Sequence, residues 1–289
     1  MTMLETGAMT VSPSDQRGRT PTVLTVAGSD SGGGAGIQAD LKTFAAWGMH
    51  GTSAITCVTA QNPDCVRAIE ALSPSLVSAQ IAAVCEAFPV AAVKTGMLYS
   101  AALIAATADA LQAAGTPNLV VDPVMVATSG GCLLHDAALE TLCARLLPLA
   151  RVVTPNVPEA EVLIGQKIET RATQIDAAKH IATRFGTACV VKGGHLIGLA
   201  DEASGASIPI LVDVLVTDSG AVHQFRTPVI KARETHGTGC TFAAALAAGL
   251  ALQLPLPEAV RRATDYVSLA LRRAITTGAH APLGWLKPE

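Results

Sequence analysis

Charged and aromatic side chains are scarce in this sequence, and neither sign of charge predominates. Of its 289 residues, 15% are charged and 3% are aromatic, and the formal net charge is −3. Without a run of lysines and arginines the chain lacks the basic surface that nucleic-acid binding needs, so we expect no nucleic-acid partner. It also lacks an apolar run of about 20 residues, the length that crosses a bilayer, so we expect no membrane partner.

Paired cysteine motifs are also missing. The seven cysteines are odd in number, form no C-x-x-C pair and mostly sit in apolar segments, which argues against a disulfide framework or a zinc knuckle. We therefore expect a reducing, cytoplasmic environment. Residues 1–20 lack the apolar segment of a secretory signal, and we interpret them as a disordered N-terminal extension.

The rest of the chain, 21–289, alternates between short β-branched runs and longer helical patterns, which predicts one α/β domain with a mostly parallel sheet covered on both faces. The polar stretch 198–209 interrupts this pattern and predicts an exposed loop. The expected strands are 23–27, 53–60, 90–94, 119–122, 152–154, 189–192 and 211–216. The expected helices are 37–47, 74–88, 101–114, 136–146, 158–164, 173–185, 241–253 and 257–276.

Polar residues stand at the ends of four expected strands. Asp122 follows L-V-V, Asn156 follows V-V-T-P, Lys192 ends C-V-V-K, and Lys94 ends V-A-A-V-K. Ligands of open α/β sheets bind beyond the carboxyl ends of the strands, so these side chains are expected at one rim. A single polar strand end is usually only a cap, but four on successive strands favour a site.

A glycine cluster joins the first expected strand to the first expected helix. The stretch A-G-S-D-S-G-G-G-A-G-I-Q-A-D (27–40) has no Gly-Lys-Ser/Thr and so is not a Walker loop. Ile37 stands where a dinucleotide fingerprint would place its last glycine. Four glycines within 32–36 are a costly way to build an ordinary turn, which favours close backbone approach to a ligand.

A second cluster, Gly237-Thr238-Gly239-Cys240, precedes an alanine-rich helix. A helix N-terminus offers unpaired N–H groups to an anion, so this is a candidate phosphate or oxyanion cradle. Cys240 at such a place is expected to have its thiolate favoured. From these residues alone, however, a small buried cysteine remains the commoner interpretation, and His236 is expected to hydrogen-bond locally.

These patterns together predict one site with a glycine cluster at each end. The first glycine loop lies at one end and the anion cradle at the other, with four polar residues between them as candidate metal and phosphate ligands. These are Asp122, Asn156, Glu159 and Lys192. Phosphoryl transfer needs such parts: positioning, cationic stabilisation of the phosphates and a way to take the acceptor's proton.

At this point the chain resembles the hydroxymethylpyrimidine/phosphomethylpyrimidine kinases of thiamine biosynthesis, in the ribokinase-like superfamily. The resemblance covers about 22–250 and implies a three-layer α/β/α sandwich, a homodimer, ATP as donor and Mg²⁺ as helper. The rival within the superfamily is a pyridoxal kinase. The matching stretches are A-G-S-D-S-G-G-G-A-G-I-Q-A-D-L-K-T (27–43), V-T-A-Q-N (58–62), V-K-T-G-M-L (93–98), D-P-V-M (122–125), T-P-N-V-P-E-A (154–160), V-K-G-G-H (191–195) and T-H-G-T-G-C-T (235–241).

The resemblance also implies roles for single residues. Gln61 would hydrogen-bond the aminopyrimidine, because a carboxamide offers one acceptor beside one donor. The rest of that pocket would comprise Gly28, Asp40, Thr59 and Met97. Lys192 would steady the phosphates, and Asp122, Asn156 and Glu159 would serve the Mg²⁺–nucleotide side. The amides of Gly237, Thr238, Gly239 and Cys240 would hold the transferring phosphoryl group.

Cys240 is then expected to act as the base for the hydroxymethyl group, where most sugar kinases of the superfamily carry Asp. Two other classes stay open: an acyl transferase or hydrolase with Cys240 as nucleophile, and a non-catalytic nucleotide-binding module. The C-terminal G-A-H-A-P-L-G-W-L (278–286) lacks the glycine-rich segment ending in Asn-His of many family members, so no site is expected there.

Overall fold

The computed structural model of the chain describes residues 20–125, 136–194, 196, 209–232 and 235–288. The expected N-terminal extension, apart from Thr20, lies outside these residues. The same is true of the expected loop at 198–209, apart from Pro209. No helix of the described part is long and apolar enough to cross a membrane.

The described strands form one nine-stranded sheet in the order β3-β2-β1-β4-β5-β6-β7-β8-β9. The pairs from β2 through β1, β4, β5 and β6 to β7 are parallel, and β3, β8 and β9 are added antiparallel. The predicted mostly parallel sheet is confirmed. The strands are β1 (Thr22–Asp30), β2 (His50–Gln61), β3 (Val66–Ala71), β4 (Val90–Thr95), β5 (Leu119–Val121), β6 (Val152–Val153), β7 (Ala188–Val191), β8 (Ile210–Val216) and β9 (Val222–Pro228).

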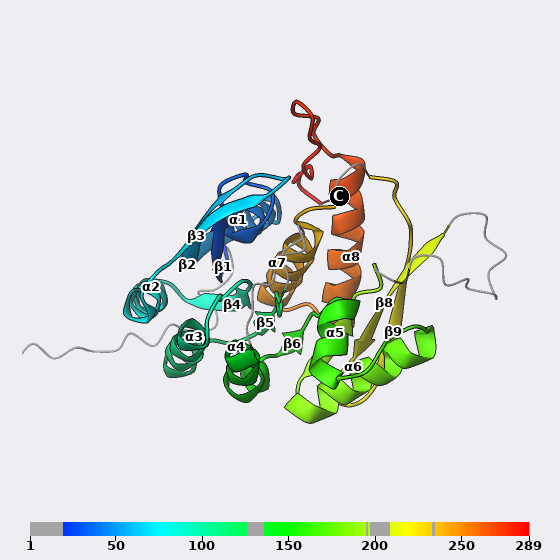
Figure 1. Cartoon of the computed structure of the whole chain (residues 1–289), viewed down its shortest axis with the longest axis horizontal. Helices are drawn as coiled ribbons and strands as arrows, with labels where there is room; N and C mark the ends of the chain where they lie inside the picture. Colours follow the sequence, from blue (N-terminus) through cyan, green and yellow to red (C-terminus); the bar gives the residue numbers. More distant parts are fainter. Residues whose placement is uncertain (1–19, 126–135, 195, 197–208, 233–234, 289) are drawn as a thin grey trace, which may run out of the picture.

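Helices cover both faces of this sheet and give the predicted α/β/α sandwich (Figure 1). Helices α2 to α6 pack on one face and α1, α7 and α8 on the other. The helices are α1 (Gly36–Ala46), α2 (Pro74–Ala87), α3 (Ala101–Ala113), α4 (Asp136–Thr141), α5 (Val157–Ile164), α6 (Arg171–Phe185), α7 (Thr238–Ala251) and α8 (Leu256–Arg272).

Alternation along the strands divides the core between the two faces. Val93 and Val121 point toward α2–α6, whereas Ala92 and Val120 point toward α1, α7 and α8. Both sets are fully buried, which is why the strands have continuous apolar sequences. The second face is lined mainly by alanines of α7, and their small side chains let this helix lie close to the sheet.

Two edge strands, β3 and β9, were not expected from the sequence. Their side chains are mostly exposed or half-buried, and in β9 only Phe225 is buried. An edge strand that exposes one face to solvent has a polar sequence without an apolar run. A prediction based on apolar runs therefore misses such a strand.

The expected helix limits are mostly confirmed. Ser73 caps α2, and its Oγ accepts the N–H of Leu76 at 3.3 Å. Gly48 and Gly115, expected to end helices, have φ values of +73° and +60°. Helix α7 begins at Thr238, three residues earlier than expected, so Gly239 and Cys240 lie within its first turn.

Candidate active site

A cavity of about 600 Å³ opens at the carboxyl ends of the parallel strands, where ligands of such sheets bind. It lies between the two glycine loops and extends toward β8, β9 and α8. Its size suits a small ring together with a nucleotide. The predicted site residues that line it are Gly28, Thr59, Gln61, Met97, Asp122, Asn156, Glu159, Lys192, Gly237, Thr238, Gly239 and Cys240.

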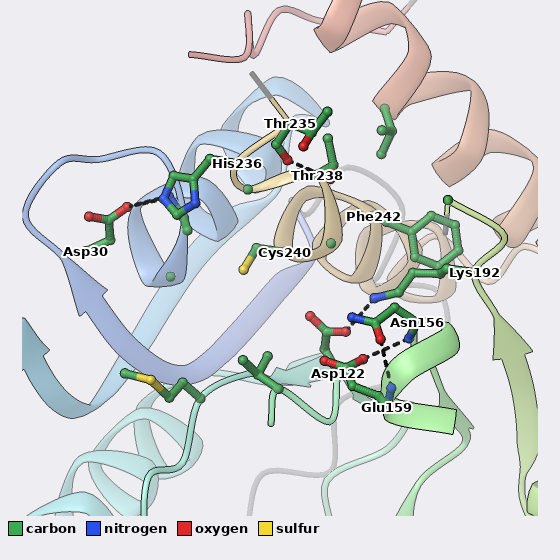
Figure 2. Close-up of a pocket in the computed structure, with 18 of the residues that line it drawn as sticks. Asp30, Asp122, Asn156, Glu159, Lys192, Thr235, His236, Thr238, Cys240 and Phe242 are labelled. Atoms are coloured by element: carbon green, nitrogen blue, oxygen red, sulfur yellow. Dashed lines mark hydrogen bonds and ion pairs between the residues drawn. The ribbon is translucent and has the colours of Figure 1, made fainter. Parts of the chain in front are cut away.

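The first glycine loop folds around the carboxylate of Asp30. Asp30 accepts the backbone N–H groups of Gly32, Gly34 and Ala35 at 2.8, 3.1 and 2.8 Å. It also pairs with Nε2 of His236 at 3.1 Å (Figure 2). Burial acts to raise the pKa of Asp30, but the hydrogen bonds from His236 and the loop amides outweigh it and lower that pKa. Asp30 therefore stays ionised and ties the two glycine loops together.

The second glycine loop requires glycine at Gly237. This residue has a φ of +85° and precedes the first turn of α7. A Cβ there would lie 1.8 Å from the carbonyl oxygen of Gly34, so any side chain would push the loops apart. The amide of Thr238 donates to the carbonyl of Thr235. The amides of Gly239 and Cys240 come next, in the first turn of the helix, where backbone N–H groups have no partner within the helix and can bind an anion.

Gln61 lies at the end of β2, and the first glycine loop holds its backbone. Its N–H donates to Oγ of Ser31, and this hydroxyl donates to the carbonyl of Gln61, both at 2.7 Å. Thr59 donates its only hydroxyl proton more closely to Ser29 (2.8 Å) than to Oε1 of Gln61 (3.3 Å). Nε2 of Gln61 also lies 3.5 Å from Nε2 of His236. Because the amide carries two N–H groups, the carboxamide still keeps one donor and its acceptor for a ligand.

Gly28 and Met97 set the width of this end of the cavity. A Cβ at Gly28 would lie 2.8 Å from Sγ of Cys57 and 2.8 Å from Cε of Met97. Cys57 and Met97 therefore pack directly against the Gly28 backbone, and a side chain at Gly28 would displace them.

Asp40, predicted to line the ring pocket, is fully buried and is not among the described residues that line the cavity. Its carboxylate accepts from Thr25 at 2.6 Å and from Nζ of Lys94 at 2.7 and 2.9 Å. Lys94, which the sequence marked only as a strand end, does line the cavity. Burial lowers the pKa of Lys94, but the charge of Asp40 outweighs this and raises it. Asp40 thus acts on the cavity through a lysine that stays cationic.

Cys240 projects from the first turn of α7 between the Asp30–His236 pair and the Asp122–Lys192 pair (Figure 2). Burial raises its pKa to about 11, although Lys94 acts to lower it. This is the opposite of the direction expected from its place at a helix N-terminus. The partial charge of the helix end is outweighed by desolvation and by two nearby carboxylates, those of Asp40 and Asp122.

Lys192 and Asp122 form a partly buried pair beside the anion cradle. Nζ of Lys192 lies 2.9 Å from Oδ1 of Asp122, which also accepts from Thr154 at 3.1 Å. A Cβ at Gly239 would lie 3.4 Å from Nζ of Lys192, so the ammonium lies against the first turn of α7. Burial lowers the pKa of Lys192, but Asp122 outweighs this and raises it. Lys192 thus keeps a positive charge beside the first turn of α7.

Asn156 and Glu159 form the capping box of α5. Oδ1 of Asn156 accepts the amide of Glu159 at 2.9 Å, and Oε2 of Glu159 accepts the amide of Asn156 at 2.8 Å. Burial raises the pKa of Glu159 to about 7, Lys192 acts to lower it, and Asp122 acts to raise it. Two of the three predicted metal-side residues, Asn156 and Glu159, are therefore also helix-capping residues.

The carboxylates of Asp122 and Glu159 fit a role in holding Mg²⁺. The described residues contain no group of three or more His, Cys, Asp or Glu that could hold a metal unaided. Mg²⁺ commonly uses only one or two carboxylates, together with substrate phosphates and water. Burial is the main cause of the raised pKa of Glu159, and the charge of Asp122 adds to it, so a cation bound with a nucleotide would favour the ionised form of Glu159.

Several lining residues were missed by sequence reasoning. Asp30 precedes a glycine run, and that position could have marked it as an acceptor for loop amides. Other lining residues come from β3, from β9 and the two residues after it, and from β8 and α8. The edge strands β3 and β9 were not expected at all, whereas for β8 and α8 the sequence predicts the element but not which of its side chains face a cavity. These lining residues are Val66, Ile69, Leu211, Asp213, Thr227, Pro228, Val229, Ile230, Thr264, Val267, Ser268 and Leu271.

Known proteins share this arrangement over most of the chain. The chain is 47% identical over 256 residues to a hydroxymethylpyrimidine/phosphomethylpyrimidine kinase of Rhizobium meliloti, covering 88% of this chain and 92% of that protein. It is 46% identical over 262 residues to a thiamine biosynthesis bifunctional protein of Geobacter sulfurreducens. That match covers 90% of this chain but 51% of the relative, so the chain spans about half the length of that protein.

Among solved structures, the fold is similar to that of a Bacillus subtilis pyridoxal kinase in an ADP complex. The TM-score is 0.81 at 33% sequence identity, and the match covers 92% of this chain and 97% of that one. The family model described as phosphomethylpyrimidine kinase matches residues 30–283, which include both glycine loops, the strand-end polar residues and the first turn of α7. The chain belongs to this family of ribokinase-like phosphotransferases.

Proposed function

We propose that this kinase phosphorylates 4-amino-5-hydroxymethyl-2-methylpyrimidine with ATP, and then phosphorylates the resulting monophosphate to the diphosphate, in thiamine biosynthesis. The observation that carries the proposal is the position of the Gln61 carboxamide, which faces the same cavity as the anion cradle. The 47% identity to a kinase named for both substrates supports it.

The ring of the pyrimidine would lie over Gly28, against Met97 and Thr59, with its amino group and ring nitrogen on Gln61. A carboxamide meets an aminopyrimidine edge with one acceptor and one donor, and its backbone is held by two short hydrogen bonds to Ser31. In this orientation the hydroxymethyl group would face Cys240 across the cavity.

The phosphates of ATP would lie between Lys192 and the first turn of α7. Lys192 neutralises the transferring group, while the amides of Gly239 and Cys240 hold its equatorial oxygens, since charge develops there in phosphoryl transfer. Asp122 and Glu159 would hold Mg²⁺, which would screen the phosphate charge when bound. Val229, Phe242 and Val267 also line the cavity, and these apolar side chains would receive the base of the nucleotide.

Cys240 would accept the hydroxymethyl proton as the new P–O bond forms. With a pKa of about 11, its thiol is almost fully protonated at pH 7, so the thiolate is a minor form. A loose transition state asks little of the base, so positioning carries much of the contribution. We expect Cys240→Ala to lower kcat strongly with little change in KM, and kcat of the wild type to rise from pH 7 to pH 9.

Pyridoxal kinase is the second candidate, because a pyridoxal kinase shares the fold at 33% identity. Both substrates carry a hydroxymethyl group on a flat ring, and the cavity walls alone do not separate them. The Gln61 carboxamide matches the aminopyrimidine edge better than a pyridine ring. We therefore expect the pyrimidine to be preferred and pyridoxal to be a side substrate.

We also propose a cytoplasmic homodimer acting on a small-molecule substrate. The six described cysteines are all free thiols, which suits a reducing compartment. The edge strand β3 and the neighbouring Val58, which is 46% exposed, offer one surface for a second copy. Light scattering of the eluted peak in size-exclusion chromatography measures the mass directly, and a monomer at micromolar concentration contradicts the dimer.

The test of function is coupled-enzyme detection of ADP with each candidate substrate. ADP release with the pyrimidine at a higher kcat/KM than with pyridoxal supports the proposal. Gln61→Ala should lower kcat/KM for the pyrimidine more than for pyridoxal. If neither substrate stimulates ADP release, the proposed kinase activity is contradicted, and the chain would be interpreted as a nucleotide-binding module.

A further inference from the structure

Trp285, near the C-terminus, contacts one residue beside each glycine loop, Lys42 and Thr241, although no site was expected in this segment. Its indole Nε1–H donates to Oγ1 of Thr241 at 3.0 Å. Nζ of Lys42 lies over its ring, 4.4 Å from the centroid. Thr241 belongs to the first turn of α7 and directly follows Cys240, whereas Lys42 belongs to α1 and binds the first glycine loop.

The segment that carries Trp285 is fixed by its own packing. In Figure 1 the red C-terminal segment folds back from the end of α8. Gly284 donates its N–H to the carbonyl of Ala270 at 3.0 Å, and a Cβ at Gly284 would lie 1.9 Å from the carbonyl oxygen of Arg273. Leu283, beside it, is only 1% exposed. Trp285 is therefore presented from a rigid position.

The contact with Thr241 bears on the anion cradle. Thr241 is fully buried, and its amide donates to the carbonyl of Gly237 at 2.9 Å. Its hydroxyl accepts the indole N–H, so the side chain is held from outside the helix while its backbone closes the turn that contains Gly239 and Cys240. A shift of Thr241 would move these two amides together.

The contact with Lys42 bears on the first glycine loop. Nζ of Lys42 donates to the carbonyl of Gly33 at 2.6 Å and stacks on the indole. Burial lowers the pKa of Lys42, although Asp30 acts to raise it. The loop in turn holds the backbone of Gln61 through Ser31. Lys42 thus links Trp285 to the residue proposed to bind the pyrimidine.

We propose that Trp285 is a positioning residue for the phosphoryl transfer, which aligns the anion cradle through Thr241 and the pyrimidine pocket through Lys42. The proposal rests on the proposed function for its kinetic effects. Its two contacts act on different steps. Loss of the Thr241 contact lowers kcat, and loss of the Lys42 contact raises KM for the pyrimidine.

The kinetic experiment separates the two contacts with single substitutions. Trp285→Phe keeps a ring beside Lys42 but removes the indole N–H, and Thr241→Val removes the acceptor with the same shape. Each should lower kcat by about three- to tenfold, the worth of one hydrogen bond, with KM nearly constant. The double variant should lose no more than either single one, because both lose the same bond. Lys42→Met should raise KM for the pyrimidine with kcat nearly constant.

Trp47→Phe is the matched control. Among the described residues its buried indole N–H has no hydrogen-bond acceptor, so this substitution should leave kcat and KM within twofold of the wild type. A kcat of Trp285→Phe within twofold of the wild type contradicts the proposal. Additive losses in the double variant, or equal losses in Trp47→Phe, contradict it as well.

A second measurement does not depend on phosphoryl transfer. It therefore tests the positioning role of Trp285 even if the proposed function is wrong. Trp285→Phe and Thr241→Val should speed alkylation of Cys240 by iodoacetamide at least about threefold, because the first turn of α7 loosens. The rate is read from the Cys240 peptide by mass spectrometry, with Trp47→Phe as control. An unchanged rate in both variants overturns the positioning role. A faster rate in a protein that makes no ADP would uphold it and refute only the kinase activity.

Discussion

The reactivity of Cys240 follows directly from its surroundings. A thiol with a pKa of about 11 is about 0.1% thiolate at pH 8, whereas one at the ordinary value of 9.0 is about 10%. Because only the thiolate reacts, and a more basic thiolate is intrinsically more nucleophilic, iodoacetamide should alkylate Cys240 about tenfold more slowly at pH 8 than an unperturbed thiol. The rate should keep rising tenfold per pH unit to about pH 10.5.

The assay follows the Cys240 peptide by mass spectrometry from pH 7 to pH 11, with Cys240→Ser to identify the peptide. Two variants test the electrostatic cause. Lys94→Met should slow alkylation, since the lysine lowers the pKa of Cys240, and Asp40→Asn should speed it, since the carboxylate raises that pKa. A rate plateau below pH 9.5 would refute the reasoning, as would faster alkylation in both variants, which would indicate only a loosened fold.

Three further predictions concern other parts of the site. Gln61→Glu should raise KM for the pyrimidine at least about tenfold in steady-state assays, because a carboxylate lacks the N–H donor; an unchanged KM would remove Gln61 from the pocket. Gly237→Ala should abolish measurable ADP release, because its Cβ meets the Gly34 carbonyl, whereas Gly48→Ala, also at positive φ but with open space, should keep kcat and cost about 1–2 kcal/mol of stability. Because the folded-state pKa of Glu159 is raised, its ionisation costs stability as pH rises from about 4.5 to about 7. Glu159→Gln, which keeps a capping-box side chain, should therefore raise the free energy of unfolding by about 3 kcal/mol at pH 8 and change it little at pH 4, measured by urea denaturation. Equal changes at both pH values would rule out the charge as the cause.

The parts of the fold that bury apolar runs were predictable from the sequence. The continuous β-branched runs at 119–122 and 189–192 mark strands covered on both faces, and the structure has β5 and β7 there. Ser73 and Gly48 mark helix limits through capping chemistry that acts over a few residues. The edge strands β3 and β9 could not be found this way, because their pairing depends on neighbours distant in sequence.

The location of the candidate site was predictable from the sequence, but the ionisation of its residues was not. Strand ends converge because parallel strands share a direction, so Asp122, Asn156 and Lys192 lie together as expected. The ionisation of Cys240 was not predictable, since its pKa depends on burial and on Asp40 and Lys94, which the sequence does not place beside it. The contact of Trp285 with Thr241 is of the same kind, because 44 residues separate the partners.

Product analysis tests the central claim most directly. The full chain is incubated with ATP, Mg²⁺ and 4-amino-5-hydroxymethyl-2-methylpyrimidine, and the phosphorylated products are followed over time by phosphorus NMR and mass spectrometry. We predict that the pyrimidine monophosphate forms first and that the diphosphate then accumulates at its expense. ATP consumption without either pyrimidine phosphate, or phosphorylation of pyridoxal alone, would contradict the account.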